Sequence, residues 1–377
     1  MVPRAAVSTP EPPVFLEGAR HGGGVPWPTR ARRFLREHHR KIWWVHSLYA
    51  LGLGAFVASF AQKGLERARY LAVTLGLAWL LAIVVFRVFG SGKKQRDLSL
   101  SPAQDRVSFF VMTYVLKNLY QGMLFFLLPF YWKSSTLDAP NAWFVVALGV
   151  CALLSTLDIV FDHVLMRFST LASVFHGFTL FACLDLLLPA LFPDMRPSMA
   201  LLTSAGVSIL AFWTFHAPSW TYGEPRWLGL LAAAVLASAG LAWGLRTLVP
   251  PVPLYLARAA VGPARLADGE SALLPDGRLK LEVKALHVST VKDLVAVTDV
   301  AAPGARVRGL CHVWRQRGRE ILRTPRRDAE VDASHRARSS STLAGKQLPE
   351  QLAGPWSVDV ETDDGQLVGR TEFTVIE

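Results

Sequence analysis

Seven runs of apolar residues follow one another up to residue 248, each close to the ~20 residues that an α-helix needs to cross the hydrocarbon core of a bilayer. Polar stretches that contain Gly, Pro, Lys and Arg separate them. We therefore predict an all-α membrane bundle of about seven transmembrane helices within residues 41–249. The runs are 42–61, 70–89, 107–132, 142–166, 171–191, 199–215 and 227–248.

The pattern changes after residue 249. The prolines of VPPVP end the last apolar run, because proline cannot continue a helix. Residues 262–377 contain short runs of β-forming residues and turn signals such as DDG at 363–365, an Asp-Gly pair typical of β-hairpins. About eight strands are expected, which predicts a soluble all-β domain, an immunoglobulin-like sandwich. Residues 250–261 are predicted to be a linker.

The N-terminal segment and the loops predict the orientation. Residues 1–40 are rich in Pro, Gly and Arg, so we expect a disordered basic tail. Cytoplasmic loops carry an excess of Lys and Arg. The third-to-fourth and fifth-to-sixth loops hold one basic residue each, Lys133 and Arg196, whereas the second-to-third region is strongly basic. We expect a cytoplasmic N-terminus, and an odd number of crossings then puts the C-terminal domain on the other side. The basic residues of the second-to-third region are Arg87, Lys93, Lys94, Arg96 and Arg106.

Several polar residues fall inside the apolar runs, where they are expensive and mark either a buried structural pair or a working site. The helix geometry suggests that Lys117 reaches Asp158 or Asp185 with its long side chain. Such a pair could hold the bundle together, or it could belong to an ion or proton pathway or a polar pocket for a lipid head group. The predicted intramembrane polar cluster is Lys117, Asn118, Gln121, Asp158, Asp162 and Asp185.

A second candidate site lies in the β domain. Period-two geometry puts His312 and Trp314 on one face of a strand, and Arg336, Arg338 and Ser340 on one face of another. Arginine beside tryptophan suits a sugar or an acidic group, so these five residues are a predicted binding face. For His312 and Trp314, packing in the core is an equally good interpretation. For Trp356, the core is the better one.

Composition excludes several classes of protein. The formal net charge is +11, but no basic groove with interleaved aromatic residues predicts nucleic-acid binding. Three cysteines set no disulfide framework, and no ligand spacing predicts a metal site. No familiar nucleophile, metalloprotease or phosphate-loop motif is present, so we expect no cofactor and favour a protein that is not an enzyme.

Two regions resemble an uncharacterised bacterial family of multi-pass inner-membrane proteins that end in a small β domain of unknown function. The first runs from LPFYWKSSTLDAPNAWF to ALLSTLDIVFDHVL, and the second contains CHVWRQRG, RARSSSTL and GPWSVDVETDDGQLVGRTEFTV. The resemblance implies architecture and an inner-membrane location. Together with the orientation expected from the basic residues, this predicts a periplasmic C-terminal domain. It implies no activity. One departure is Ala337, where a large residue is expected between the two arginines.

Three hypotheses about function remain open at this stage. In the first, the bundle anchors a periplasmic sandwich that binds an envelope glycan, a lipid head group or a protein partner. In the second, the bundle is a transporter or an ion-coupled signalling protein that uses Lys117, Asp158 and Asp185. In the third, it is a membrane-embedded enzyme acting on lipid-linked substrates. Membrane lipids are the expected partners in all three, and the sequence does not determine the oligomeric state.

Overall fold

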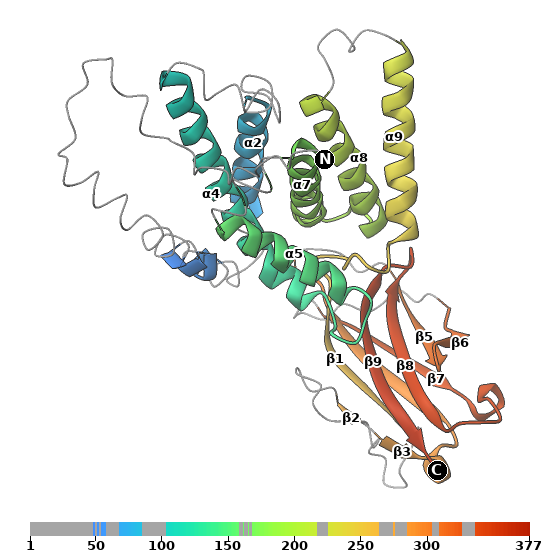
Figure 1. Ribbon diagram of the computed structural model, residues 1–377. Coiled ribbons are helices and arrows are strands. Elements are labelled where there is room, and N and C mark those ends of the chain that lie inside the picture. Colours follow the sequence, from blue (N-terminus) through green and yellow to red (C-terminus); the bar gives the residue numbers. More distant parts are fainter. Residues whose placement is uncertain are drawn as a thin grey trace, which may run out of the picture.

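The computed structural model describes residues 48–57 except 50 and 53, then 68–84, 103–157, 161, 165, 168–216, 225–263, 274–275, 285–303, 309–325 and 336–377. The predicted tail 1–40 lies outside these residues. Figure 1 shows a helical region at one end of the molecule and a β domain at the other. The helices are α2 (Ala68–Val84), α4 (Ala103–Lys133), α5 (Ala142–Thr156), α7 (Ser169–Leu191), α8 (Pro197–His216) and α9 (Pro225–Gly244).

Among the residues that the structure describes, three stretches of helix are long and apolar enough to cross a membrane: Thr170–Leu191, Pro197–Thr214 and Pro225–Gly244. Shorter apolar helices are found at Ala72–Leu81 and Ala142–Thr156. The prediction of a helical N-terminal region that contains candidate membrane spans is therefore confirmed in this coarser form. The bundle of seven spans stays a prediction.

Within the helix expected over 142–166, α5 ends at Thr156 and Leu157 is extended, with ψ of 98°, while Phe161 and Leu165 beyond it are again helical. The last two helical side chains bond back to their own helix: Ser155 Oγ donates to the carbonyl of Ala152 at 2.6 Å, and Thr156 Oγ1 donates to Leu153 at 2.7 Å. Such bonds compete with the continuing backbone ladder and often bend helices. At 15 residues, α5 is about 22 Å long.

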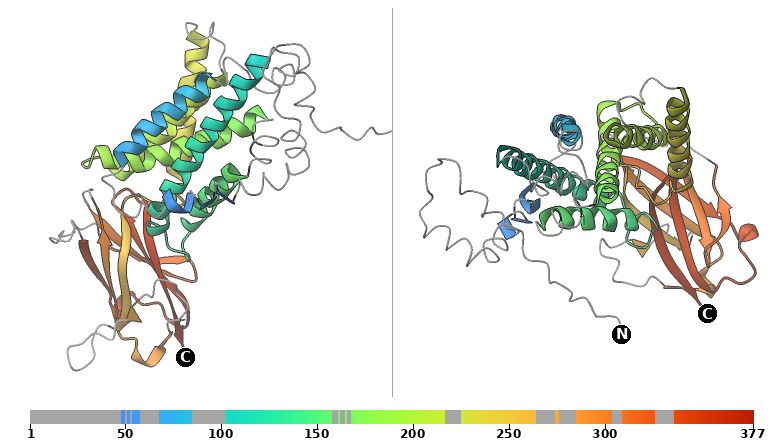
Figure 2. Two further views of the ribbon diagram at one scale, coloured as in Figure 1. Left: turned by 90° about the vertical axis from the view of Figure 1, so that its left-hand side faces the viewer. Right: turned by 45° about the horizontal axis from the view of Figure 1, so that its top comes forward.

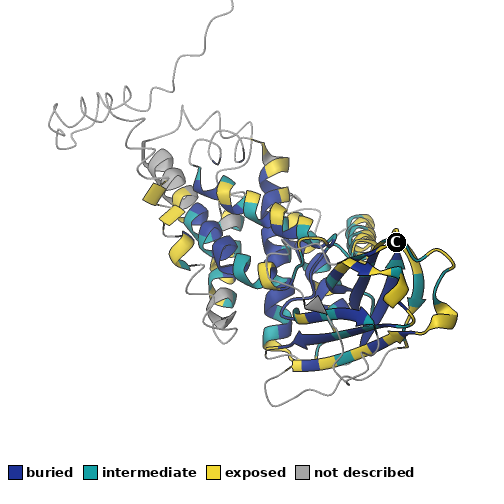
Figure 3. Cartoon of the chain, turned by 90° about the horizontal axis from the view of Figure 1, so that it is seen from below, coloured by how far each residue is buried: buried dark blue, intermediate teal, exposed yellow. Residues whose placement is uncertain are grey.

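Helices α4 and α7 run in the same direction, so residues at similar distances from their C-terminal ends meet. Tyr120 lies against His176, with ring centroids 5.3 Å apart, and Tyr131 lies against α7 nearer the β domain. Helix α5 crosses between them, where Phe144 packs on Tyr131 at 5.0 Å and on Phe178 at 5.3 Å. Figure 3 shows the buried residues concentrated where helices meet and between the sheets. Helix α9 packs on α8 and buries none of its residues.

The β domain consists of two sheets that pack face to face. One has the order β2-β1-β4-β7 and the other β3-β9-β8-β5-β6. The first strand begins at Tyr255, inside the stretch predicted to be a linker, and pairs with β4 from there. The strands are β1 (Tyr255–Pro263), β2 (Leu274–Pro275), β3 (Ala285–His287), β4 (Leu294–Ala301), β5 (Leu310–Gln316), β6 (Arg319–Arg323), β7 (Arg336–Leu343), β8 (Gly354–Thr362) and β9 (Leu367–Ile376).

The sandwich core is made by inward-facing residues of both sheets. Trp314 and Trp356 are its largest buried side chains, and the Trp356 ring stacks on Phe373 at 6.0 Å. The predicted Asp-Gly hairpin is confirmed between β8 and β9, where Gly365 has a φ of 83°. A predicted β domain is therefore confirmed, and its immunoglobulin-like classification stays a prediction.

The sandwich is docked against the end of the helical region where α4 and α7 end and α8 begins (Figure 2). Asn141, at the start of α5, donates from Nδ2 to the carbonyl of Leu367 at 3.0 Å. The Arg370 amide donates to Thr136 Oγ1 at 3.0 Å. The Ser198 amide, in the first turn of α8, donates to Asp364 Oδ2 at 2.9 Å. These hydrogen bonds hold the end of β8 and β9 on the helices.

Candidate functional site

Two of the predicted intramembrane residues belong to a larger buried polar group. Lys117 and Gln121 lie on one face of α4 with Tyr120 between them, and all three side chains are buried. Ser173 and His176 are buried on one turn of α7, and the Tyr120 ring contacts His176 edge-on. We call these five residues the α4–α7 polar group.

Other members of the predicted cluster lie elsewhere. Asn118 is half-buried and donates from Nδ2 to the Tyr114 carbonyl of its own helix at 2.8 Å. Asp158 and Asp162 lie outside the described residues. A pair between Lys117 and Asp158 therefore stays a prediction. Within the described part of the chain, Tyr120 Oη is buried and has no hydrogen-bond partner.

The structure places Asp185 with Tyr131 rather than with Lys117. Tyr131 Oη lies 3.1 Å from Asp185 Oδ2 and 2.9 Å from the Ala182 carbonyl oxygen. Tyr131 is fourteen residues beyond Lys117 on α4, which is about 21 Å of helix. The expected reach of Lys117 to Asp185 is thus wrong, because α4 and α7 are parallel and the two residues lie at different levels.

In the β domain, His312 and Trp314 point into the space between the two sheets. His312 Nε2 lies 2.8 Å from Thr298 Oγ1, and Nδ1 lies 2.7 Å from Ser341 Oγ. Trp314 Nε1 donates to the same Ser341 oxygen at 3.0 Å. Thr298 and Ser341 belong to β4 and β7, so the network fastens one sheet to the other.

Burial lowers the pKa of His312 to about 4, because the protonated ring would lose its hydration in the interior. The hydrogen bonds fit a neutral ring. Ser341 accepts from Trp314 and can donate its own proton to Nδ1, while the Nε2 proton goes to Thr298. His312 and Trp314, from the segment CHVWRQRG, are therefore core residues, and Ser341 and Thr298 complete their hydrogen-bond network. Neither of these two was predicted as a site residue.

The five residues of the predicted binding face consequently do not share one surface. Arg336, Arg338 and Ser340 are exposed on the outer face of β7, opposite to the side that His312 and Trp314 face. Alternation along a strand gives the shared face of each pair, but it does not say which face is inside. Whether the arginines bind a ligand stays a prediction.

Strand register adds two residues to the outer face of β7. Asp299 of β4 is paired with Arg338 on one side and with Arg258 of β1 on the other. Arg338 donates to both Asp299 oxygens, from Nε at 2.8 Å and from Nη2 at 3.3 Å, while its own side chain is 73% exposed. We call Arg258, Asp299, Arg336, Arg338 and Ser340 the arginine face. Its described residues carry three arginines and one aspartate.

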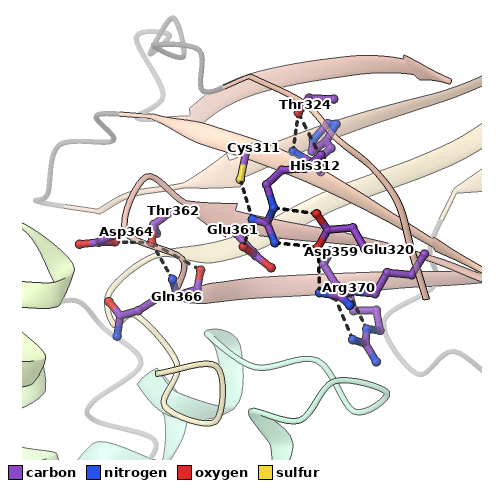
Figure 4. Close-up of polar contacts among 12 residues, drawn as sticks. Cys311, His312, Glu320, Thr324, Asp359, Glu361, Thr362, Asp364, Gln366 and Arg370 are labelled. Carbon is purple, nitrogen blue, oxygen red and sulfur yellow. Dashed lines mark hydrogen bonds and ion pairs between the residues drawn. The ribbon is translucent and has the colours of Figure 1, made fainter. Parts of the chain in front are cut away.

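The outer face of the other sheet carries a different set of charges, drawn in Figure 4. Asp359 is buried and accepts from Arg370 at both oxygens, at 2.6 and 3.0 Å. Arg315 donates to the same carboxylate at 3.0 Å. Hydrogen bonding to Asp359 raises the pKa of Arg370. Arg370 also donates to the Asp138 carbonyl at 3.4 Å and so reaches the loop that precedes α5.

The same face continues through a second carboxylate. Arg323 Nη1 donates to Glu361 Oε2 at 2.6 Å, and its other nitrogens donate to both oxygens of Glu320 at 3.0 Å. These bonds raise the pKa of Arg323, and the bond from Arg323 lowers the pKa of Glu320. Arg315, Arg323 and Arg370 thus balance Asp359, Glu361 and Glu320, and we call these six residues the ion-pair network.

Comparison with known families assigns the chain but gives no activity. No curated protein matches it. Residues 308–375 match a protein of unknown function (DUF2914), and residues 26–287 match a family of unknown function (DUF5924). The two matches divide the sandwich, because β1, β2 and β3 lie in the first, β5 to β9 in the second, and β4 between them. The DUF5924 match covers more than half of the chain, which therefore belongs to this family of unknown function.

Proposed function

We propose that the protein is a multi-pass membrane protein whose helices hold the β-sandwich at the membrane surface, where the arginine face binds an acidic group of the cell envelope. The observation that carries this proposal is the docked sandwich. Its β8–β9 end rests on the first turn of α8, and α8 is one of the candidate spans. The strand ends nearest the helices would therefore lie at head-group level.

Register supports a position of the arginines close to the membrane. Arg336 is paired with Ala301, which is paired with Tyr255, the first residue of β1 after α9. Arg258 and Arg338 lie in the next row on this face, about 7 Å further along the strands. A guanidinium group offers a planar pair of donors that matches phosphate and carboxylate oxygens. We therefore favour the head group of an acidic phospholipid as the ligand over a glycan or a protein.

The expected orientation fits this proposal. The two loops with a single basic residue, after α4 and after α7, lie on the side of the sandwich. By the distribution of Lys and Arg, this side is the outer one, the N-terminus is cytoplasmic and the sandwich is periplasmic. The bacterial inner membrane is the location that the sequence resemblance implies.

The test is lipid retention by the purified full chain, measured by native mass spectrometry after addition of phosphatidylglycerol or phosphatidylcholine. We expect retention of phosphatidylglycerol to fall about thirtyfold in a double variant Arg258→Gln and Arg338→Gln, since each of the two phosphate contacts is worth about 1 kcal/mol. Arg319→Gln, an exposed arginine of the other sheet, is the matched control. Equal retention by the double variant and the control would refute the proposal.

A second candidate function is supported by the α4–α7 polar group, since ionisable residues buried inside a bundle commonly mark an ion or proton pathway. Proteoliposomes that contain the full chain and a pH-sensitive dye would show proton flux, and Lys117→Met should abolish it. Asn118→Leu is the control, because Asn118 bonds its own helix. Wild-type protein that conducts no protons would exclude this function.

A further inference from the structure

The hairpin that joins β8 and β9 contacts the first turn of α8. We call residues 362–367 the rim hairpin. Its Asp364 is held on both oxygens: Oδ2 accepts from the Ser198 amide at 2.9 Å, and Oδ1 accepts from Thr362 Oγ1 at 2.5 Å. A carboxylate at the N-terminus of a helix is favourable, because the first amides of the helix lack partners within it.

The next residue of the rim hairpin lies against the segment that follows α9. Gly365 has a φ of 83°, and a Cβ at this position would lie 3.1 Å from Nε of Arg246. Arg246 is itself positioned by Trp243, whose ring lies 4.8 Å away and whose carbonyl accepts from Nη1 at 2.9 Å. Only glycine suits this place, since a side chain would be strained by the backbone and crowded by the guanidinium group.

Two polar groups at the same contact are buried without a partner. The Gln366 side chain is fully buried, and within the described part of the chain neither Oε1 nor Nε2 has a hydrogen-bond partner. Figure 4 shows this amide, in the turn between β8 and β9, pointing away from Thr362. Nε of Arg246 is also buried and has no partner among the described residues.

A dehydrated, unpaired polar group raises the free energy of the state that buries it. Water would reach the Gln366 amide and the Arg246 guanidinium once the rim hairpin left the helices, so only the docked state bears this cost. The bonds of Asp364, Asn141 and Thr136 act in the opposite direction. The unpaired groups thus raise the free energy of the docked state, and these hydrogen bonds lower it.

We infer that the rim hairpin is a releasable contact between the sandwich and the helices, held by Asp364 and weakened by the buried Gln366 amide. Release frees the first turn of α8, which is a candidate span, so the position of the sandwich is coupled to a transmembrane helix. A ligand that prefers the docked or the released state shifts the balance between them. This inference does not depend on which ligand the arginine face takes.

Hydrogen exchange of the full chain in lipid nanodiscs, followed by mass spectrometry, tests the holding contact. The peptides that contain the Ser198 and Arg370 amides report docking, because both amides donate across the contact. We expect Asp364→Ala to accelerate their exchange about tenfold, as for loss of one charge-assisted hydrogen bond. Asp363→Ala, in the same turn, should leave the exchange unchanged. Unchanged exchange in Asp364→Ala would overturn the inference.

The opposing contribution is tested with Gln366→Leu, which removes the unpaired amide and keeps a similar volume. Exchange at Ser198 and Arg370 should slow about tenfold, since an unsatisfied buried group costs at least as much as one hydrogen bond. Gln347→Leu, at an exposed position far from the helices, is the control. Exchange that is unchanged or faster in Gln366→Leu would show that the amide does not weaken the contact. These readouts do not involve lipid retention, so they fail or succeed separately from the proposed function.

Discussion

The two outer faces of the sandwich carry the same kinds of residue and yet differ in charge balance. The ion-pair network has three arginines and three carboxylates, and its Asp359 and Glu361 side chains are 3% and 6% exposed. The described arginine face has three arginines around Asp299, and Arg338 remains 73% exposed although it is paired. A balanced, covered network is suited to holding strands together. A face with an excess of one charge is suited to an outside ligand of the opposite charge.

The largest expected effect on stability comes from disrupting the ion-pair network. Asp359→Ala leaves Arg315 and Arg370 without their shared carboxylate, and removal of one partner from a buried ion pair costs about 3 kcal/mol of unfolding free energy. Thermal unfolding of the purified chain measures this loss. Asp363→Ala, in the turn beyond β8, is the control. A loss no larger than in the control would mean that the network does not stabilise the sandwich.

The next effect concerns the interior between the two faces. Folding lowers the pKa of His312 from its usual value near 6.5 to about 4. Between these two pH values His312 is protonated in the unfolded chain and neutral in the folded chain. The contribution of His312 to the free energy of unfolding is therefore fully present above pH 6.5. It is lost as the pH drops towards 4, by roughly 3 kcal/mol. The measurement is unfolding of the wild type and of His312→Gln at a series of pH values. If both lost stability with the same slope, the histidine would not be the titrating group.

The substitution Asp299→Asn should have the smallest effect on stability. It also tests directly whether the arginine face differs in role from the ion-pair network. Its partner Arg338 is largely exposed, so the loss should stay below about 1 kcal/mol. The substitution also raises the positive charge of the arginine face, and retention of phosphatidylglycerol should increase. Reduced retention would mean that Asp299 positions the arginines for the ligand instead of opposing it. Calorimetry and native mass spectrometry on the same samples separate the two outcomes.

The fold could be predicted in outline, because periodicity and turn chemistry are local. The Asp-Gly pair predicted the β8–β9 hairpin, and alternation put His312 with Trp314 and Arg336 with Arg338. The first strand was missed because YLARAAVGP follows the prolines so closely that it read as linker. The end of α5 at Thr156 was missed because an apolar run continues past it and no proline or glycine marks the position.

The sites depended on contacts between residues far apart in the chain. Asp299 and Arg258 join Arg338 only through the register of three strands, and Asp359 meets Arg370 and Arg315 in the same way. Because α4 and α7 are parallel, Asp185 lies beside Tyr131, and it is Tyr120, one turn beyond Lys117, that contacts His176. Counting residues from each end of an apolar run had not given these levels. No signal within a single segment could have found these partners.

The sequence alone therefore determined the division into an apolar helical part and a β part, since both depend on spacing along the chain. It also determined which side chains share a strand face. Only the tertiary structure decided which of those faces is buried, which charges meet, and that the rim hairpin rests on α8. The physical reason is that burial and ion pairing are properties of neighbours in space, and neighbours are chosen when sheets pair and helices pack.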